Sequence, residues 1–149
     1  MKKLSFIILF LLFLIGKESL AQCKVDVWEI SFYSGYINNK YPIKMAITVM
    51  NVYTDSDQMY CVYRGYYYYT NVGKKLFLYG GYNPNGYMGA ANPREVWDDI
   101  VERENEDGNT ITGIFSFIRA DIGGNEMNGY WQKSIDSNEK YPVKLKKIF

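Results

Sequence analysis

The sequence predicts a single all-β domain over residues 22–149, folded as an antiparallel meander or partly open barrel of about seven or eight strands. Two observations predict this fold. Segments in which apolar and polar residues alternate follow one another, separated by clusters of Gly, Asn, Asp, Ser and Pro. Several of these segments also share one motif, a large residue, any residue, Gly, any residue and a large, mostly aromatic residue. Both are typical of strands joined by turns.

The first predicted elements form a long hairpin over residues 42–69. Apolar residues recur at every second position of its first strand, which predicts one buried face: Ile43, Met45, Ile47 and Val49. The turn-forming residues near 55–57 close the hairpin. The sequence "NVGKK" then turns the chain into "LFLYGG", a strand on which Leu76 and Leu78 share a face.

The segment 82–92, "YNPNGYMGAAN", is too rich in Gly, Asn and Pro for a central strand, so we expect a long loop. Residues 93–103 allow two interpretations. Asn92 and Pro93 are typical of a helix start, which would give a short helix near 93–103. A hairpin turn signal, "ENEDGN", follows directly, and the later segments are all strand-like. We therefore favour a strand from about Val96 to Arg103.

The remaining segments predict three further strands. Their inward residues occupy alternate positions: Ile111, Phe115 and Phe117 in the first, Met127 and Trp131 in the second, and Val143 and Leu145 in the last. The last strand begins "EKYPVKL", which repeats "NKYPIKM" of residues 39–45. In a closed sheet the two Tyr-Pro strands would be able to lie side by side.

The run "YRGYYYY" carries tyrosines on both faces of its strand. If Gly65 lies on the core face, as in the other copies of the motif, Tyr63, Tyr67 and Tyr69 point inward. The residues that point outward are then Tyr60, Arg64, Tyr66 and Tyr68. Together with Tyr130 of a later strand and Tyr82 and Tyr87 of the long loop, they are a candidate partner-binding surface. Exposed Tyr and Arg are frequent hot spots of interfaces, but cross-strand aromatic pairs also stabilise sheets.

Residues 1–21 have the features of a secretory signal peptide. Two lysines precede an apolar run too short to span a bilayer, and Ser19 and Ala21 precede the expected cleavage site. We expect export to the periplasm or the extracellular space. Lys2, Lys3, Lys17 and Glu18 leave with the peptide, so the mature chain keeps 14 basic and 15 acidic residues, a net charge of −1 that gives no reason to expect nucleic acid as a partner.

The two cysteines, Cys23 and Cys61, predict a disulfide in an exported chain, because two thiols without histidine are at best half of a zinc site. An alternative concerns "LAQC", which is similar to a lipoprotein signal in which Cys23 becomes lipidated. Gln22 departs from the small residue usual at that position.

Catalytic and cofactor motifs are scarce. The chain has no histidine, no glycine-rich phosphate loop and no nucleophile elbow, and we expect neither a metal nor a cofactor. A carboxylate pair for hydrolysis is conceivable among Asp98, Asp99 and Glu102. The crowding of acids in this segment is more simply explained by solvent exposure.

The segments "GYINNKYPIKM", "YRGYYYY", "ITGIFSF", "NGYW" and "YPVKL" together resemble a group of small exported proteins of Bacteroidetes-type bacteria. The resemblance covers most of residues 30–148 and implies an antiparallel β meander, with no known activity or site residues. The 82–95 region departs from the group as an insertion. The Gly-aromatic strands are also loosely similar to MORN-type hairpins, without their regular period.

The predicted function is that of a non-enzymatic exported binding protein of the envelope or the medium, of the inhibitor or immunity type, with another protein or a glycan as its partner. The alternative is a carbohydrate-binding module that uses the surface tyrosines. A ligand cavity of the lipocalin kind would require a hollow barrel, whereas Phe115, Phe117 and Trp131 predict a filled interior.

Overall fold

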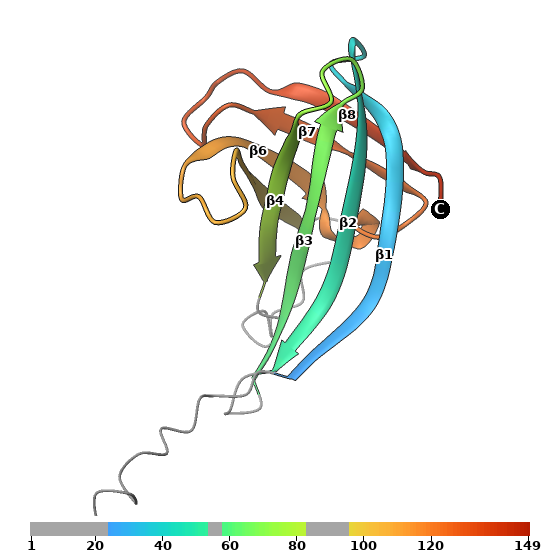
Figure 1. Cartoon of the computed structure of the whole chain (residues 1–149), viewed down its shortest axis with the longest axis vertical. Coiled ribbons are helices and arrows are strands. Elements are labelled where there is room, and N and C mark those ends of the chain that lie inside the picture. Colours follow the sequence, from blue (N-terminus) through green and yellow to red (C-terminus); the bar gives the residue numbers. More distant parts are fainter. Residues whose placement is uncertain (1–23, 54–57, 83–95) are drawn as a thin grey trace, which may run out of the picture.

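The computed structural model, which describes residues 24–53, 58–82 and 96–149, is a closed barrel of eight antiparallel strands (Figure 1). Each strand pairs with its neighbours in the chain, and the last pairs with the first through a register that joins Tyr33 to Lys147 and Ile37 to Val143. The strands are β1 (Lys24–Ile37), β2 (Tyr41–Tyr53), β3 (Met59–Tyr69), β4 (Lys75–Tyr82), β5 (Trp97–Arg103), β6 (Ile111–Ile118), β7 (Glu126–Gln132) and β8 (Tyr141–Lys147). Between β6 and β7 lies a 3₁₀ turn, Arg119–Asp121.

The predicted fold class is therefore confirmed, and the barrel is fully closed. The long hairpin corresponds to β2 and β3. Residues 97–103 form a strand, so the alternative of a short helix is wrong over that range, while residues 93–95 lie outside the described residues. The physical reason is strand pairing, because β5 forms backbone hydrogen bonds with β4 on one side and with β6 on the other. A helix of only seven residues is marginally stable and would give up both sets of hydrogen bonds.

The two Tyr-Pro strands are not neighbours, contrary to our expectation. Strand β1 lies between β2 and β8, and its residue Ile37 pairs with Tyr41 on one side and with Val143 on the other. Closure of the barrel through β1 thus places the two repeated segments on either side of a single strand.

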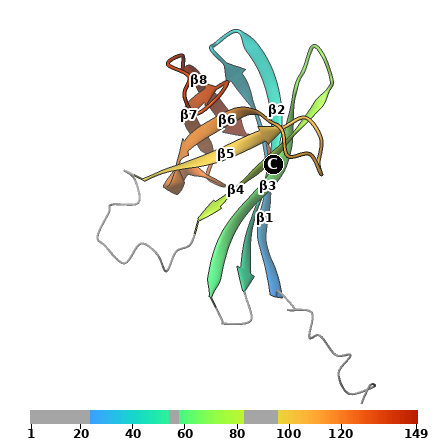
Figure 2. The same ribbon diagram turned by 90° about the vertical axis from the view of Figure 1, so that its left-hand side faces the viewer.

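The two halves of the barrel differ in length. Strands β1, β2 and β3 have 14, 13 and 11 residues, whereas β5 to β8 have seven or eight. Figures 1 and 2 show the long strands running past the short ones at one end. We call that end the lower end, and we call the end with the β1–β2 and β3–β4 turns, at the top of Figure 1, the upper end.

Every second side chain along a strand points into the barrel. Tyr67 packs edge-on against Phe115 with ring centroids 5.0 Å apart, and Phe115 stacks on Phe117 at 5.8 Å. Burial of each such side chain contributes roughly 1.5–3 kcal/mol. The apolar residues of this core are Tyr33, Ile37, Ile43, Met45, Ile47, Cys61, Tyr63, Tyr67, Leu78, Ile100, Phe115, Phe117, Met127, Val143 and Leu145. Ile111, expected to point inward, is 49% exposed and lies beside an irregularity in the β5–β6 pairing.

Glycines of the repeated motif allow strands to approach closely. A Cβ atom on Gly65 would lie 2.0 Å from the carbonyl oxygen of Ala46 on β2, and one on Gly129 would lie 2.1 Å from that of Ser116 on β6. Backbone atoms of a paired strand have little room to withdraw. Only glycine therefore fits where the barrel wall bends this tightly.

Candidate functional site

Strand β5 carries two carboxylates into the barrel. Asp98, Ile100 and Glu102 share its inner face, and the two acids are 5% and 3% exposed. Asp99 points outward and accepts a hydrogen bond from Ser116. The interpretation of this acidic segment as solvated was therefore wrong for Asp98 and Glu102, because strand alternation forces them to the same side as the buried Ile100.

Asp98 lies toward the lower end and is paired with Arg119 of the 3₁₀ turn. Arg119 Nε and Nη2 donate to Asp98 Oδ1 and Oδ2 over distances of 2.6–3.0 Å, and the Tyr63 hydroxyl donates to Oδ2 at 2.7 Å. The hydrogen bond with Asp98 raises the pKa of Arg119. The guanidinium also lies 3.7 Å from the ring centroid of Tyr82. This ion pair fastens the turn to the barrel wall.

Glu102 lies nearer the upper end and has a different set of partners. The Tyr67 hydroxyl donates to its Oε2 at 2.7 Å, the Trp131 indole Nε1 donates to the same oxygen at 2.9 Å, and the Thr112 hydroxyl lies 2.7 Å from Oε1. No lysine or arginine forms an ion pair with Glu102 among the residues that the structure describes. Burial, and then the negative charge of Glu102, raise the pKa of Tyr67.

Gly113 makes room for this arrangement. A Cβ atom on Gly113 would lie 2.5 Å from Trp131 Nε1 and 2.8 Å from Glu102 Oε2. The indole thus covers the gap that the glycine leaves in the wall. In this way the Gly-aromatic motif allows the ring of one strand to lie over the glycine of the neighbouring strand.

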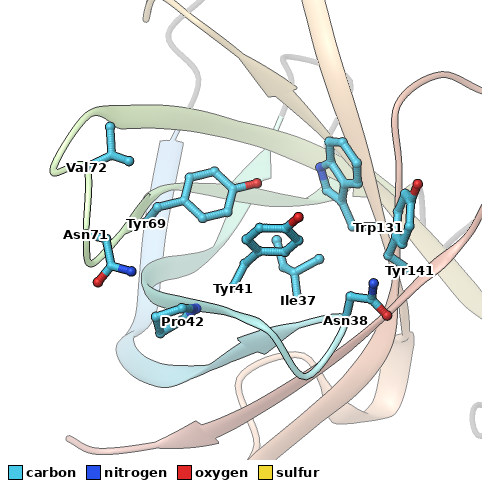
Figure 3. A pocket seen from close by; sticks show the side chains of 9 residues that line it. All are labelled: Ile37, Asn38, Tyr41, Pro42, Tyr69, Asn71, Val72, Trp131 and Tyr141. Atoms are coloured by element: carbon cyan, nitrogen blue, oxygen red, sulfur yellow. The ribbon is translucent and has the colours of Figure 1, made fainter.

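A pocket of about 510 Å³ opens at the upper end of the barrel (Figure 3). Its walls hold two pairs of rings. Tyr41 and Tyr69 meet edge-on with centroids 6.3 Å apart, and Trp131 and Tyr141 meet at 6.0 Å with a tilt of 34°. The lining residues carry no formal charge: Ile37, Asn38, Tyr41, Pro42, Tyr69, Asn71, Val72, Trp131 and Tyr141.

The repeated Tyr-Pro strand starts build much of this pocket. Tyr41 begins β2 and Tyr141 begins β8, so the repeat delivers one ring from each side of β1. Asn38 and Asn39 turn the chain with φ of 56° and 52°, a region that asparagine tolerates well. The Asn38 amide nitrogen donates to the Pro142 carbonyl at 2.7 Å, which ties this turn to β8.

The polar ends of three of the four rings are connected to carboxylates. Trp131 donates to Glu102 directly, and the Tyr69 hydroxyl lies 3.5 Å from that of Tyr67, which itself donates to Glu102. Tyr141 donates to Glu139 at 2.7 Å, and this hydrogen bond raises the pKa of Tyr141. The pKa of Tyr69 is raised by burial and also by the negative charge of Glu102.

The residues predicted as a partner-binding surface do not form one patch. On β3, Tyr60 donates to Gln58, and Arg64 points outward with its guanidinium 4.5 Å from the Tyr79 ring centroid. The ammonium of Lys75, on β4, lies 4.5 Å from the ring centroid of Tyr66 on β3. Tyr68, also on β3, is half-buried. The ammonium of Lys75 thus lies over one of the predicted binding tyrosines, Tyr66, and Arg64 contacts a neighbouring ring of β4.

Tyr130 lies elsewhere. It belongs to β7, four strands from β3 in a barrel of eight, and therefore sits on the opposite wall, stacked on Trp97 with centroids 5.7 Å apart. The ring of Tyr82 packs with Tyr63 and Arg119 at the lower end. Tyr87 lies outside the described residues.

Cys61 is a free thiol in the structure, buried inside the barrel wall, and burial raises its pKa. Its expected partner, Cys23, lies outside the described residues, so the disulfide and the alternative of a lipidated Cys23 stay predictions.

Comparison with protein-family models finds no match, and comparisons with curated proteins and with solved structures find none either. The resemblance to small exported β proteins thus stays a prediction. Within residues 24–53, 58–82 and 96–149 no helix is long and apolar enough to cross a membrane. In the same ranges no three His, Cys, Asp or Glu side chains come together as a metal site would need.

Proposed function

We propose that this protein is a non-enzymatic exported binding protein and that its binding site is the upper pocket. The observation that carries the proposal is a cavity of about 510 Å³ lined by four aromatic rings. Its volume falls in the range of about 300–1,000 Å³ usual for small-molecule sites, which are mostly apolar with a few polar groups and often lie at the mouth of a barrel.

The pocket is organised before a ligand arrives. Trp131 is held by Glu102, Tyr141 by Glu139, and the Asn38 turn by the Pro142 carbonyl. Side chains that are already ordered lose little conformational freedom on binding, and this favours affinity. A ring-shaped or compact ligand of moderate size is the class that such rigid walls suit best.

The absence of catalysis is part of the proposal. Asp98 is engaged by Arg119 and Tyr63, and Glu102 by three hydrogen-bond donors, so both carboxylates have partners within the fold. Neither lines the pocket. These contacts support a role in holding side chains in place, in contrast to the alternative of a carboxylate hydrolase.

A second candidate function concerns the outer wall. Trp97 and Tyr130 are 45% and 43% exposed and stack on each other. An exposed aromatic pair of this kind favours docking to another envelope or secreted protein, as an inhibitor or immunity-type protein would do. Its location is separate from the upper pocket, so the two functions are testable independently.

The experiment that tests the pocket is a calorimetric screen of sugars, amines and neutral ring compounds against residues 22–149. Tyr41→Ser with Tyr141→Ser removes two exposed or half-buried rings of the pocket, and Tyr130→Ser is the matched control on the other wall. We expect a ligand whose binding the first variant loses and the control keeps. A ligand that both variants bind equally would place the site elsewhere.

A further inference from the structure

We infer that the upper pocket binds an organic cation, a quaternary or alkylated ammonium group. The inference rests on the proposed function, because it names the ligand class of the same pocket.

The first support is the number of ring faces. A cation is attracted to the face of an aromatic ring within about 6 Å of its centroid, most strongly to Trp, and quaternary ammonium groups are typically held by several rings at once. The upper pocket has three tyrosines and one tryptophan, Tyr41, Tyr69, Tyr141 and Trp131, and no charged residue among the described residues that line it. Figure 3 shows Tyr41 near the centre, with Tyr69 to its left and Trp131 and Tyr141 to its right.

The second support is a negative charge that forms no ion pair with a cation among the described residues. Glu102 accepts a hydrogen bond from Trp131, and all its partners within the described part of the chain are neutral donors. Asp98 on the same strand, in contrast, is neutralised by Arg119. In a poorly solvated interior such a carboxylate attracts a cation over several ångströms, and a cation in the pocket would be separated from it by a single ring.

The third support is the state of the polar groups. A sugar would require free hydroxyl and amide groups to hydrogen-bond its ring. Trp131 and Tyr141 already donate to Glu102 and Glu139. Donation to a carboxylate occupies the polar tips of Trp131 and Tyr141 and leaves their faces available, which favours a cation over a carbohydrate on this side of the pocket. The amides of Asn38 and Asn71 belong to the rest of the lining.

The chain itself shows one such contact. The ammonium of the exposed Lys40 lies 5.3 Å from the centroid of the Tyr41 ring. This positive charge at the rim competes with an incoming cation. Removal of the Lys40 charge should therefore raise the affinity for a cation, whereas removal of the Glu102 charge should lower it. These opposite effects provide the test.

The test compares choline with 3,3-dimethylbutan-1-ol, a neutral compound of the same shape, by calorimetry on residues 22–149. We expect choline to bind at least about tenfold more tightly. Glu102→Gln, whose amide oxygen still accepts from Trp131, should lower the affinity for choline several-fold more than the affinity for the neutral compound. Lys40→Met should raise the affinity for choline about two- to threefold, and Lys75→Met, on the outer wall, serves as its control.

Phosphatidylcholine vesicles, with phosphatidylglycerol vesicles as the control, distinguish a lipid headgroup from a free cation. Sedimentation with the first but not the second, lost in the Tyr41→Ser, Tyr141→Ser variant, would support the inference with the headgroup as the source. Equal affinity for choline and the neutral compound, or binding of sugars only, would overturn the inference and leave the proposed function standing. If no compound of the screen binds, both are overturned.

Discussion

Asp98 and Glu102 lie four residues apart on β5, point into the same barrel and are almost equally buried, yet their surroundings differ in charge. Arg119 neutralises Asp98, whereas the partners of Glu102 in residues 24–53, 58–82 and 96–149 are neutral donors. A buried charge is costly unless it is paired or well hydrogen-bonded. The comparison teaches that two acids of one strand have different roles: Asp98 attaches the 3₁₀ turn to the barrel wall, and Glu102 holds the indole of Trp131 at the upper pocket.

The largest effect should come from breaking the ion pair. Asp98→Ala removes the mostly buried carboxylate that accepts from Arg119 Nε and Nη2, and removal of one member of such a pair typically costs about 3–5 kcal/mol. We expect the free energy of unfolding, measured by urea denaturation, to fall by that amount.

A double-mutant cycle separates the pair from simple loss of packing. Asp98→Ala and Arg119→Met together should cost less than the sum of the two single changes, by about 1 kcal/mol or more. Strict additivity would mean that Asp98 and Arg119 do not stabilise each other, and the contrast with Glu102 would disappear.

Alkaline pH should affect both sites in the same way. Burial, followed by the neighbouring carboxylate, raises the pKa of Tyr63 beside Asp98 and of Tyr67 beside Glu102 above the usual value of 10.0. Above pH 10 the unfolded chain therefore loses these protons while the folded chain keeps them. The stabilisation is complete below pH 10 and declines as the pH rises, by about 1.4 kcal/mol per pH unit for each tyrosine.

The check is denaturation at several pH values between 9 and 12. Tyr63→Phe and Tyr67→Phe should each reduce the slope of the free energy of unfolding against pH by about 1.4 kcal/mol per pH unit. A decline that neither variant changes would assign the alkaline sensitivity to other groups of the chain.

Gly113→Ala should disturb the Glu102 site alone. The added methyl group would meet Trp131 Nε1 and Glu102 Oε2 at 2.5 and 2.8 Å, and overpacking of this kind costs about 1–3 kcal/mol. Near-ultraviolet circular dichroism should report the displaced indole, and the affinity of the upper pocket for any ligand found should fall. A variant with unchanged stability and spectrum would show that the indole does not depend on the gap at Gly113.

Much of the fold was predictable from the sequence because its signals are local. Alternation in β2 and β8, the turn residues between strands and the face assigned to Tyr63 and Tyr67 depend on neighbours in the chain, and the structure agrees with them. Closure through β1 depends on a pairing between the two ends of the domain, for which a single sequence gives no signal.

The site was harder to predict. The Tyr-Pro repeat was visible, but its meaning required the knowledge that Tyr41 and Tyr141 flank the same strand. The inward position of Glu102 follows from its alternation with Ile100 in a strand, but the density of acids in the segment points to a solvated face. The sequence predicts that Tyr66 and Tyr130 both point outward, but it does not show that their strands, β3 and β7, lie on opposite walls of the barrel.

The smallest effect, and the one that most sharpens the comparison, is expected for Glu102→Gln. The glutamine oxygen still accepts from Tyr67 and Trp131, and its amide group finds an acceptor in the hydroxyl of Thr112. No cation among the described residues loses an ion pair, so we expect the free energy of unfolding to fall by only about 1 kcal/mol. Asp98→Asn, the matched change, leaves Arg119 facing a neutral amide and should cost at least about 1 kcal/mol more. Equal losses in urea denaturation would make Glu102 as structural as Asp98 and would remove the reason to look for a cation in the pocket above it.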